Sequence, residues 1–294
     1  MASSRPLSAR VDRSPPEALF VVAAISQYLG ASVAVVMFDH MAAPGVAWLR
    51  VVGAAAVLVV ARRSWRRSWT RRELATAGAF GTVLALMNLC FYIAIAELPL
   101  GTVVAIEFLG PIAVAAFGTR TARNAAALVI AAAGVLLLAQ VQAEGSGRGI
   151  FFALLAAVFW AGYIVLGDRV AKSGTAVDGL GVGMAIGALA IAPFGVPDLG
   201  PAFDLPWLLV AGLAAGVLSN AIPYALDQVV LQRIERARFA LLLALLPATA
   251  TVVGLVVLGQ VPSVGELMGI GLVIGAVALR SREPVPARWQ TPGP

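Results

Sequence analysis

The stretch AIEFLGPIAVAA, residues 105–116, holds an acid and a proline inside an apolar run. An ionised carboxyl in apolar surroundings is costly, so Glu107 is a candidate functional group. Pro111 has no N–H, so the carbonyl of residue 107 loses its helical partner. Together they predict a wet, enclosed site at which Glu107 takes up and releases a proton. The alternative is a structural carboxyl that is permanently paired with a neighbouring donor.

A second acid lies in the apolar run SNAIPYALDQVVLQR, residues 219–233. Pro223 frees the carbonyl four residues before it, as Pro111 does in the first run. Asn220, Tyr224 and Asp227 recur at helical spacing and share one face, which makes Asp227 a second candidate for proton or substrate binding. The alternative is an ion pair between Asp227 and a nearby arginine at the membrane surface.

Arg50 also lies within an apolar run, and no residue near it in sequence neutralises it. Its long stem can reach the surface, or its guanidinium can bind a substrate carboxylate or pair with Glu107; an internal role is favoured. Other polar and aromatic side chains would line the same site, with helix packing as the alternative role for each: Gln27, Asn88, Tyr92, Trp160 and Tyr163.

The composition places these residues in a membrane protein. Hydrophobic residues make up 60% of the 294 residues and charged residues 12%, whereas a soluble domain is about half apolar and a quarter charged. The mean hydropathy is +0.92, and apolar runs long enough to cross a bilayer recur along the chain. The sequence therefore predicts an all-α polytopic membrane protein.

The same composition excludes several kinds of site and partner. The formal net charge is +6, but the dense basic run at 62–73 lies between two apolar spans, where basic residues set topology, so no nucleic-acid partner is expected. One cysteine, Cys90, and one histidine, His40, cannot form a metal cluster, and no metal or cofactor is predicted. No P-loop, Rossmann fingerprint or nucleophile elbow occurs, which disfavours an ATP-driven pump and an enzyme.

Ten transmembrane helices fit the apolar pattern, and they divide into two groups of five. We expect spans near 17–38, 43–61, 74–96, 99–118, 124–140, 148–168, 178–195, 207–230, 237–258 and 264–280. Residues 1–15 form a disordered cytoplasmic N-terminus, 16–141 a first repeat, 148–281 a second repeat, and 282–294 a cytoplasmic tail. An odd number of spans per repeat turns the second repeat upside down, which is the inverted-repeat plan of many transporters.

Two further patterns bear on this arrangement. Placing Pro111 over Pro247, an offset of 136, aligns residues 87–118 with the second repeat without a gap, and Pro247 is thereby predicted to break its helix as Pro111 does. With both termini cytoplasmic, 19 of the 21 Lys and Arg residues fall on the inner side. The glycine pairs 183/187, 212/216 and 271/275 predict close helix packing.

Four segments resemble a known family: AAPGVAWLR (42–50), the run from Met87 to Phe117, FWAGYIVLGDR (159–169) and LSNAIPYALDQVVLQRI (218–234). In this order they resemble the drug/metabolite transporter superfamily, EamA type, and within it the threonine/homoserine exporter group. The chain differs from that group at Leu246, where a glutamate is common, and at Gln260, where the group has LGE.

The resemblance implies a secondary active transporter of the inner (plasma) membrane, a proton-coupled exporter of amino acids or related small metabolites, present as a monomer or homodimer. It implies that Glu107 binds the proton or an ammonium group, with Asp227 in support. Arg50 would bind a carboxylate or hold Glu107. The residues expected to line the cavity are Asn88, Tyr92, Trp160 and Tyr224. The alternatives are transport of a drug cation, nucleobase or sugar-phosphate, a non-transporting membrane scaffold, and an intramembrane enzyme.

Overall fold

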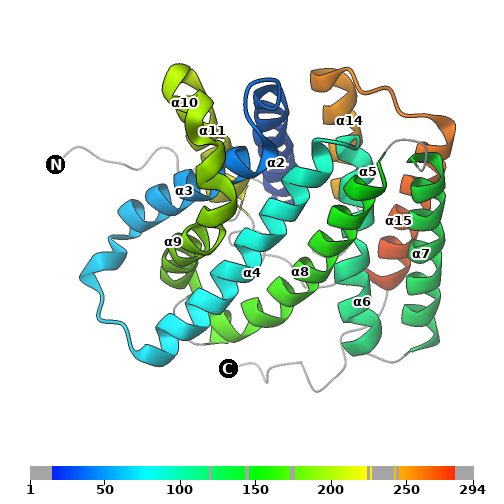
Figure 1. Ribbon diagram of the computed structural model, residues 1–294. Helices are drawn as coiled ribbons and strands as arrows, with labels where there is room; N and C mark the ends of the chain where they lie inside the picture. The colour runs from blue at the N-terminus through cyan, green and yellow to red at the C-terminus, as the bar shows by residue number, and fades with distance from the viewer. Residues whose placement is uncertain are drawn as a thin grey trace.

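The computed structural model describes residues 15–118, 121–142, 146–172, 176–223, 226, 242 and 245–281. All regular structure in this part of the chain is helical (Figure 1). The elements are α2 (Pro16–Met37), α3 (Ala43–Arg62), the 3-10 helix η1 (Ser64–Arg66), α4 (Arg71–Ile95), α5 (Leu100–Glu107), α6 (Leu109–Gly118), α7 (Ala122–Gln142), α8 (Gly147–Lys172), α9 (Ala176–Gly195), the 3-10 helix η2 (Val196–Leu199), α10 (Gly200–Asp204), α11 (Trp207–Gly216), the π-helix η3 (Val217–Ala221), α14 (Leu245–Leu258) and α15 (Val264–Ser281).

The described helices lie where the apolar runs predicted them. Five are long and apolar enough to cross a membrane, with mean hydropathy of 1.8 to 2.3, and five shorter apolar helices accompany them among the described residues. About 20 residues of helix span the hydrocarbon core, at 1.5 Å per residue. The chain is thus a polytopic helical membrane protein. It remains a prediction that all ten spans cross the membrane.

Glycines let the central helices pack with their backbones in contact. A Cβ atom on Gly183 of α9 would lie 2.5 Å from the carbonyl oxygen of Ala77 on α4, and Gly216 of α11 lies against the backbone of Arg50 on α3. The predicted close packing at the 183/187 and 212/216 pairs is confirmed. At Gly271 and Gly275 the prediction was wrong for the described atoms, because none lies within 4 Å of an added Cβ.

Two helix pairs run antiparallel, and each joins a helix of the predicted first repeat to its counterpart in the second. Residues 45 and 195, and residues 58 and 181, are neighbours between α3 and α9. α7 and α15 lie side by side in the same manner, with residue 134 near 272 and residue 138 near 269 (Figure 1). The counterpart helices in these pairs therefore point in opposite directions.

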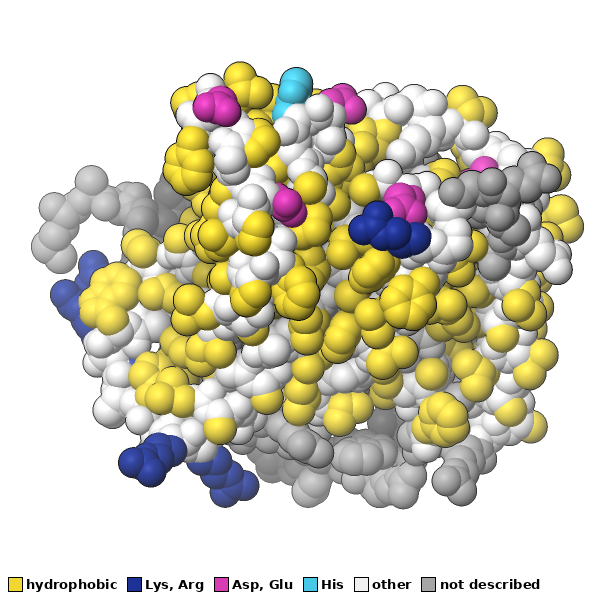
Figure 2. All heavy atoms as spheres, in the orientation of Figure 1, with side chains coloured by type: hydrophobic (Ala, Val, Ile, Leu, Met, Phe, Trp, Pro, Cys, Tyr) yellow, Lys and Arg dark blue, Asp and Glu magenta, His cyan; other side chains and the backbone are white. Residues whose placement is uncertain are grey.

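Charged side chains gather at the two ends of the helices. Figure 2 shows most acidic side chains in the upper half, one of them beside a basic side chain, most basic ones at the lower left, and a broad apolar surface between. The α3–α4 link, 63–70, carries exposed arginines, while exposed Asp39 and Asp204 lie in the α2–α3 link and at the end of α10. An apolar band between charged ends is the surface expected of a chain that lies in a bilayer.

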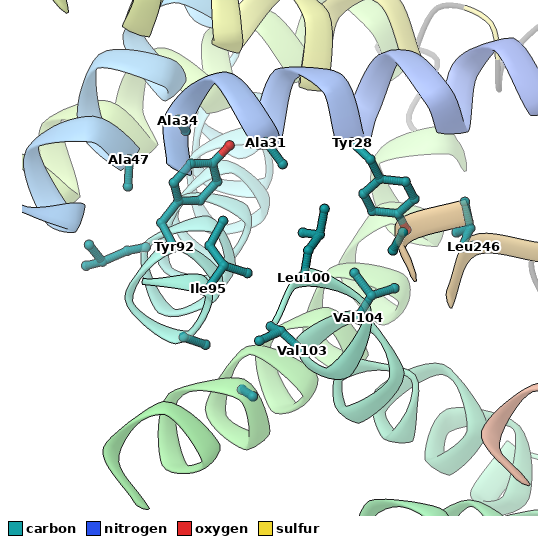
Figure 3. Close-up of a cluster of buried hydrophobic side chains, with 14 of the residues drawn as sticks. Tyr28, Ala31, Ala34, Ala47, Tyr92, Ile95, Leu100, Val103, Val104 and Leu246 are labelled. Atoms are coloured by element: carbon teal, nitrogen blue, oxygen red, sulfur yellow. The ribbon is translucent and has the colours of Figure 1, made fainter. Parts of the chain in front are cut away.

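One part of the apolar core lies where α2, α4, α5 and α14 meet (Figure 3). Tyr28 of α2, Tyr92 of α4 and Leu100 of α5 are each at most 2% exposed. Leu246 of α14 belongs to the same cluster and is 7% exposed. This core fixes the helices that surround the polar site described next.

Candidate functional site

The predicted break before Pro111 is present. α5 ends at Glu107, the turn residue Phe108 follows, and α6 begins at Leu109. Because Pro111 has no N–H, the helical hydrogen bond to the carbonyl of Glu107 is lost, whereas the next one, from Ile112 N to Phe108 O, forms at 3.2 Å. All eight residues of α5 are buried. The break therefore places Glu107 at the end of a short helix inside the bundle.

The other two prolines lie at the edges of described segments. Pro223 is buried, and the π-helix η3 ends two residues before it. Pro247 lies in α14, which is described from Leu245 onward. The carbonyl that Pro247 would leave without a helical partner belongs to residue 243, which lies outside the described residues, so the expected break at Pro247 stays a prediction.

A cavity with about 400 Å³ of empty volume lies at the end of α5. Its lining comes from α2, α3, α4, α5 and η3, so elements of both predicted repeats meet around it. Four of the predicted site residues line it: Gln27, Arg50, Asn88 and Glu107.

The Arg50 guanidinium is held by neutral groups on two other helices. Its Nε donates to Ser219 Oγ at 2.5 Å, its Nη2 donates to Asn220 Oδ1 at 2.7 Å, and its Nη1 donates to Asn88 Oδ1. The guanidinium carbon also lies 4.7 Å from the centre of the Tyr92 ring, a cation–π contact. Only 4% of Arg50 is exposed. Arg50 thus links α3 to α4 and to η3.

The backbone of η3 is arranged for this contact. Pro223 cannot donate to the carbonyl of Ser219, and Arg50 Nη2 approaches that carbonyl oxygen at 3.5 Å. The Ser219 hydroxyl donates to the carbonyl of Ala215, one turn back, while accepting from Arg50. π turns occur often at functional sites, because they displace the helix register locally. The local distortion places two consecutive side chains, Ser219 and Asn220, on the same guanidinium.

Neither buried charge has an ionic partner in the described structure. No ion pair joins Arg50 to Glu107 among the described residues, and the Glu107 carboxyl, 7% exposed, accepts no hydrogen bond from them. Burying an unpaired ion costs several kcal/mol. A cation and an anion that face the same cavity without pairing are therefore suited to a ligand that carries both charges.

Three aromatic candidates lie outside the described lining of this cavity, so their binding roles stay predictions. Tyr92 is fully buried beneath Arg50. Trp160 packs edge-on against Phe108 at 4.9 Å, and Tyr163 stacks on Phe80 at 5.0 Å. The Trp160 and Tyr163 rings fill contacts between α8 and its neighbours, while Tyr92 supports the guanidinium. Asp227 and Tyr224 lie outside the described residues.

The structure also brings forward residues that the sequence did not single out. Ser219 contacts Arg50. The sequence feature that could have identified it is Pro223, which leaves the carbonyl of Ser219 without a helical partner. Glu266 is a further buried acid, 5% exposed, at the start of α15. Its carboxylate accepts from Thr102 Oγ1 at 3.1 Å and from Ser263 N at 2.8 Å. The S-x-x-E spacing, which is typical of a capping box, could have found it.

The two positions that differ from the resembled group have structural roles here. Gln260 Oε1 accepts from the backbone N–H of Leu100 at 3.0 Å, and so caps the first turn of α5. Leu246 belongs to the apolar core and contributes no polar group.

Comparisons with known proteins agree with this architecture. The EamA-like transporter family matches residues 147–282. The threonine/homoserine exporters RhtA of Escherichia coli (strain K12) and of Salmonella typhimurium (strain LT2) are 34% identical over 265 residues, which cover 89% of this chain and 89% of each exporter. A solved crystal structure matches over 91% of this chain and 98% of its own with a TM-score of 0.56. Its identity of 19% shows a similar fold alone.

Proposed function

Because this chain belongs to the EamA-like transporter family, we propose that it is a proton-coupled exporter of amino acids or related small metabolites in the inner membrane. The family consists of transporters, not enzymes. The exporters similar to it over 89% of their length are named for threonine and homoserine, and these amino acids are the first candidate substrates.

One observation carries the proposal: a guanidinium and a carboxyl that have no ionic partner among the described residues line the same cavity. A free amino acid is a zwitterion, so its ammonium group can meet Glu107 while its carboxylate meets Arg50. The presence of a group of each sign favours amino-acid-like solutes over drug cations and sugar-phosphates.

Glu107 is the proposed proton carrier. When Glu107 is ionised it attracts an ammonium group, and when it is protonated it does not. The proton and the ammonium group of the substrate are therefore alternative ligands of one carboxyl. Gln27 and Asn88 supply further polar contacts in the cavity. Asp227 and Tyr224 stay assigned to the same pathway as predictions from the sequence.

The transport motion in this proposal is the rocking of two inverted five-helix repeats, 16–141 and 148–281, about the cavity. The antiparallel counterpart pairs α3–α9 and α7–α15 support an inverted arrangement. The family match at 147–282 coincides with the second repeat, which supports that boundary. Both termini are assigned to the cytoplasm, supported by the exposed arginines of the α3–α4 link at the end of α3 opposite to Asp39.

The experiment is flux from proteoliposomes that contain the purified protein. Vesicles are loaded with labelled L-threonine, L-homoserine, a nucleobase, a sugar-phosphate or a drug cation, and efflux is followed with and without a pH gradient. We expect gradient-dependent efflux of the amino acids. Efflux of another solute class alone would move the assignment to that class, and no efflux of any solute would favour a non-transporting scaffold.

A further inference from the structure

The side chain of Asn220 presents a donor that nothing in the described structure uses. It is 1% exposed, lines the cavity, and accepts from Arg50 Nη2 through Oδ1 at 2.7 Å. Its Nδ2 has no hydrogen-bond partner among the described residues. The amide cannot be turned around, because its nitrogen would then face the guanidinium donor to donor. The unsatisfied donor is therefore a lasting feature of this side chain.

Arg50 has a donor left as well. A guanidinium carries five N–H groups. The described contacts use four, on Ser219 Oγ, Asn88 Oδ1, Asn220 Oδ1 and the carbonyl of Ser219. Among the described residues, one N–H on Nη1 has no acceptor, and the positive charge is surrounded only by neutral acceptors. A buried donor without an acceptor costs about 1–3 kcal/mol, so these two donors call for an acceptor in the cavity.

We infer that Asn220 completes a subsite with Arg50, so that the free carboxylate of the solute is held by a donor from each of these two side chains. This inference rests on the proposed function and deepens it. An oxygen of the carboxylate accepts from the free Nη1–H of Arg50, and Asn220 Nδ2 supplies a second donor. Ser219 and Asn88 are positioning residues that hold the guanidinium plane.

The subsite depends on the shape of η3. A π turn and the buried Pro223 set Ser219 and Asn220 consecutively on Arg50, so α3 of one repeat and η3 of the other hold the guanidinium together. A carboxylate seated on Arg50 therefore contacts both repeats at once. The amine of the solute then points to Glu107, the one acid in the described lining of the cavity.

The test compares two ligands that differ only in the carboxylate: L-threonine and 1-amino-2-propanol. Thermal stabilisation and competition for threonine efflux are measured on the full-length protein in detergent and in proteoliposomes. We expect threonine to stabilise the wild type and 1-amino-2-propanol to bind at least 10-fold more weakly. Equal stabilisation by both ligands overturns the inference without any variant.

Variants then assign the donors. In Asn220→Asp the new carboxylate pairs with Arg50 and occupies the subsite, so threonine affinity falls at least 10-fold while 1-amino-2-propanol is not weakened. In Asn220→Ala the loss of one donor to a charged group lowers threonine affinity about 10- to 100-fold. The matched control is Asn124→Ala, because Asn124 is also 1% exposed and does not belong to the lining of this cavity.

Failure of the inference and failure of the proposed function give different results. If the wild type exports threonine and Asn220→Asp keeps threonine affinity within about 2-fold, the carboxylate subsite is wrong and the export function stands. If the wild type neither binds nor exports any amino acid, the proposed function itself fails. A variant that does not fold leaves the comparison of the two ligands on the wild type as the deciding measurement.

Discussion

Arg50 and Glu107 illustrate what a charge inside a membrane protein requires from its neighbours. Arg50 spreads its charge over Asn88, Ser219 and Asn220, and each hydrogen bond to a charged group contributes about 1.5–3 kcal/mol. Glu107 has no such donors among the described residues and relies on the cavity. The cation is therefore fixed in place, while the acid is left available for a ligand or a proton.

The fixed cation leads to a prediction for Arg50→Lys. A lysine keeps the charge but has one nitrogen, and it cannot reach Ser219, Asn220 and Asn88 together. We expect the melting temperature to fall by several degrees and threonine affinity to fall more than 10-fold, measured by thermal unfolding with and without threonine. The control is Arg66→Lys in the exposed α3–α4 link, which should change neither quantity. A fully active Arg50→Lys protein would contradict the proposed need for the planar guanidinium of Arg50.

At the scale of helices, small residues decide which faces meet. Gly183 has no room for a side chain, because an added Cβ would lie 2.5 Å from the Ala77 carbonyl oxygen. We predict that Gly183→Ala separates α4 from α9 and sharply lowers the yield of folded protein. Gly271→Ala is the matched control, since no described atom lies within 4 Å of its added Cβ. Its melting temperature should stay the same or rise, because alanine favours helix by about 1 kcal/mol over glycine. Equal behaviour of the two variants would refute this packing.

The helix positions and the break at Glu107 could be predicted, because both depend on local chemistry. Runs of about 20 apolar residues mark spans, and a proline removes a specific hydrogen bond wherever it stands. The contacts of η3 with Arg50 could not be predicted, because the two segments are 169 residues apart in the sequence. The sequence also could not predict which side of α8 Trp160 and Tyr163 face, because a helix that is apolar on all sides does not indicate which face is turned toward the cavity.

Over the whole molecule, the proposed topology predicts which links each side of the membrane can reach. The protein has one cysteine, Cys90, which is buried, so Cys90→Ser gives a clean background. In that background we expect Asp204→Cys to react with an impermeant maleimide on intact cells, and Arg66→Cys to react only after permeabilisation. Labelling both on intact cells would contradict the orientation, and the reverse pattern would invert it.

The whole account depends on Glu107 coupling a proton to the substrate, so the most direct test is Glu107→Gln in proteoliposomes. Glutamine keeps the size of the side chain and cannot carry the proton. We predict that threonine binds more weakly, because the neutral amide no longer attracts its ammonium group, and that efflux driven by a pH gradient falls at least 100-fold. Threonine efflux that still follows the pH gradient in Glu107→Gln would contradict the central claim.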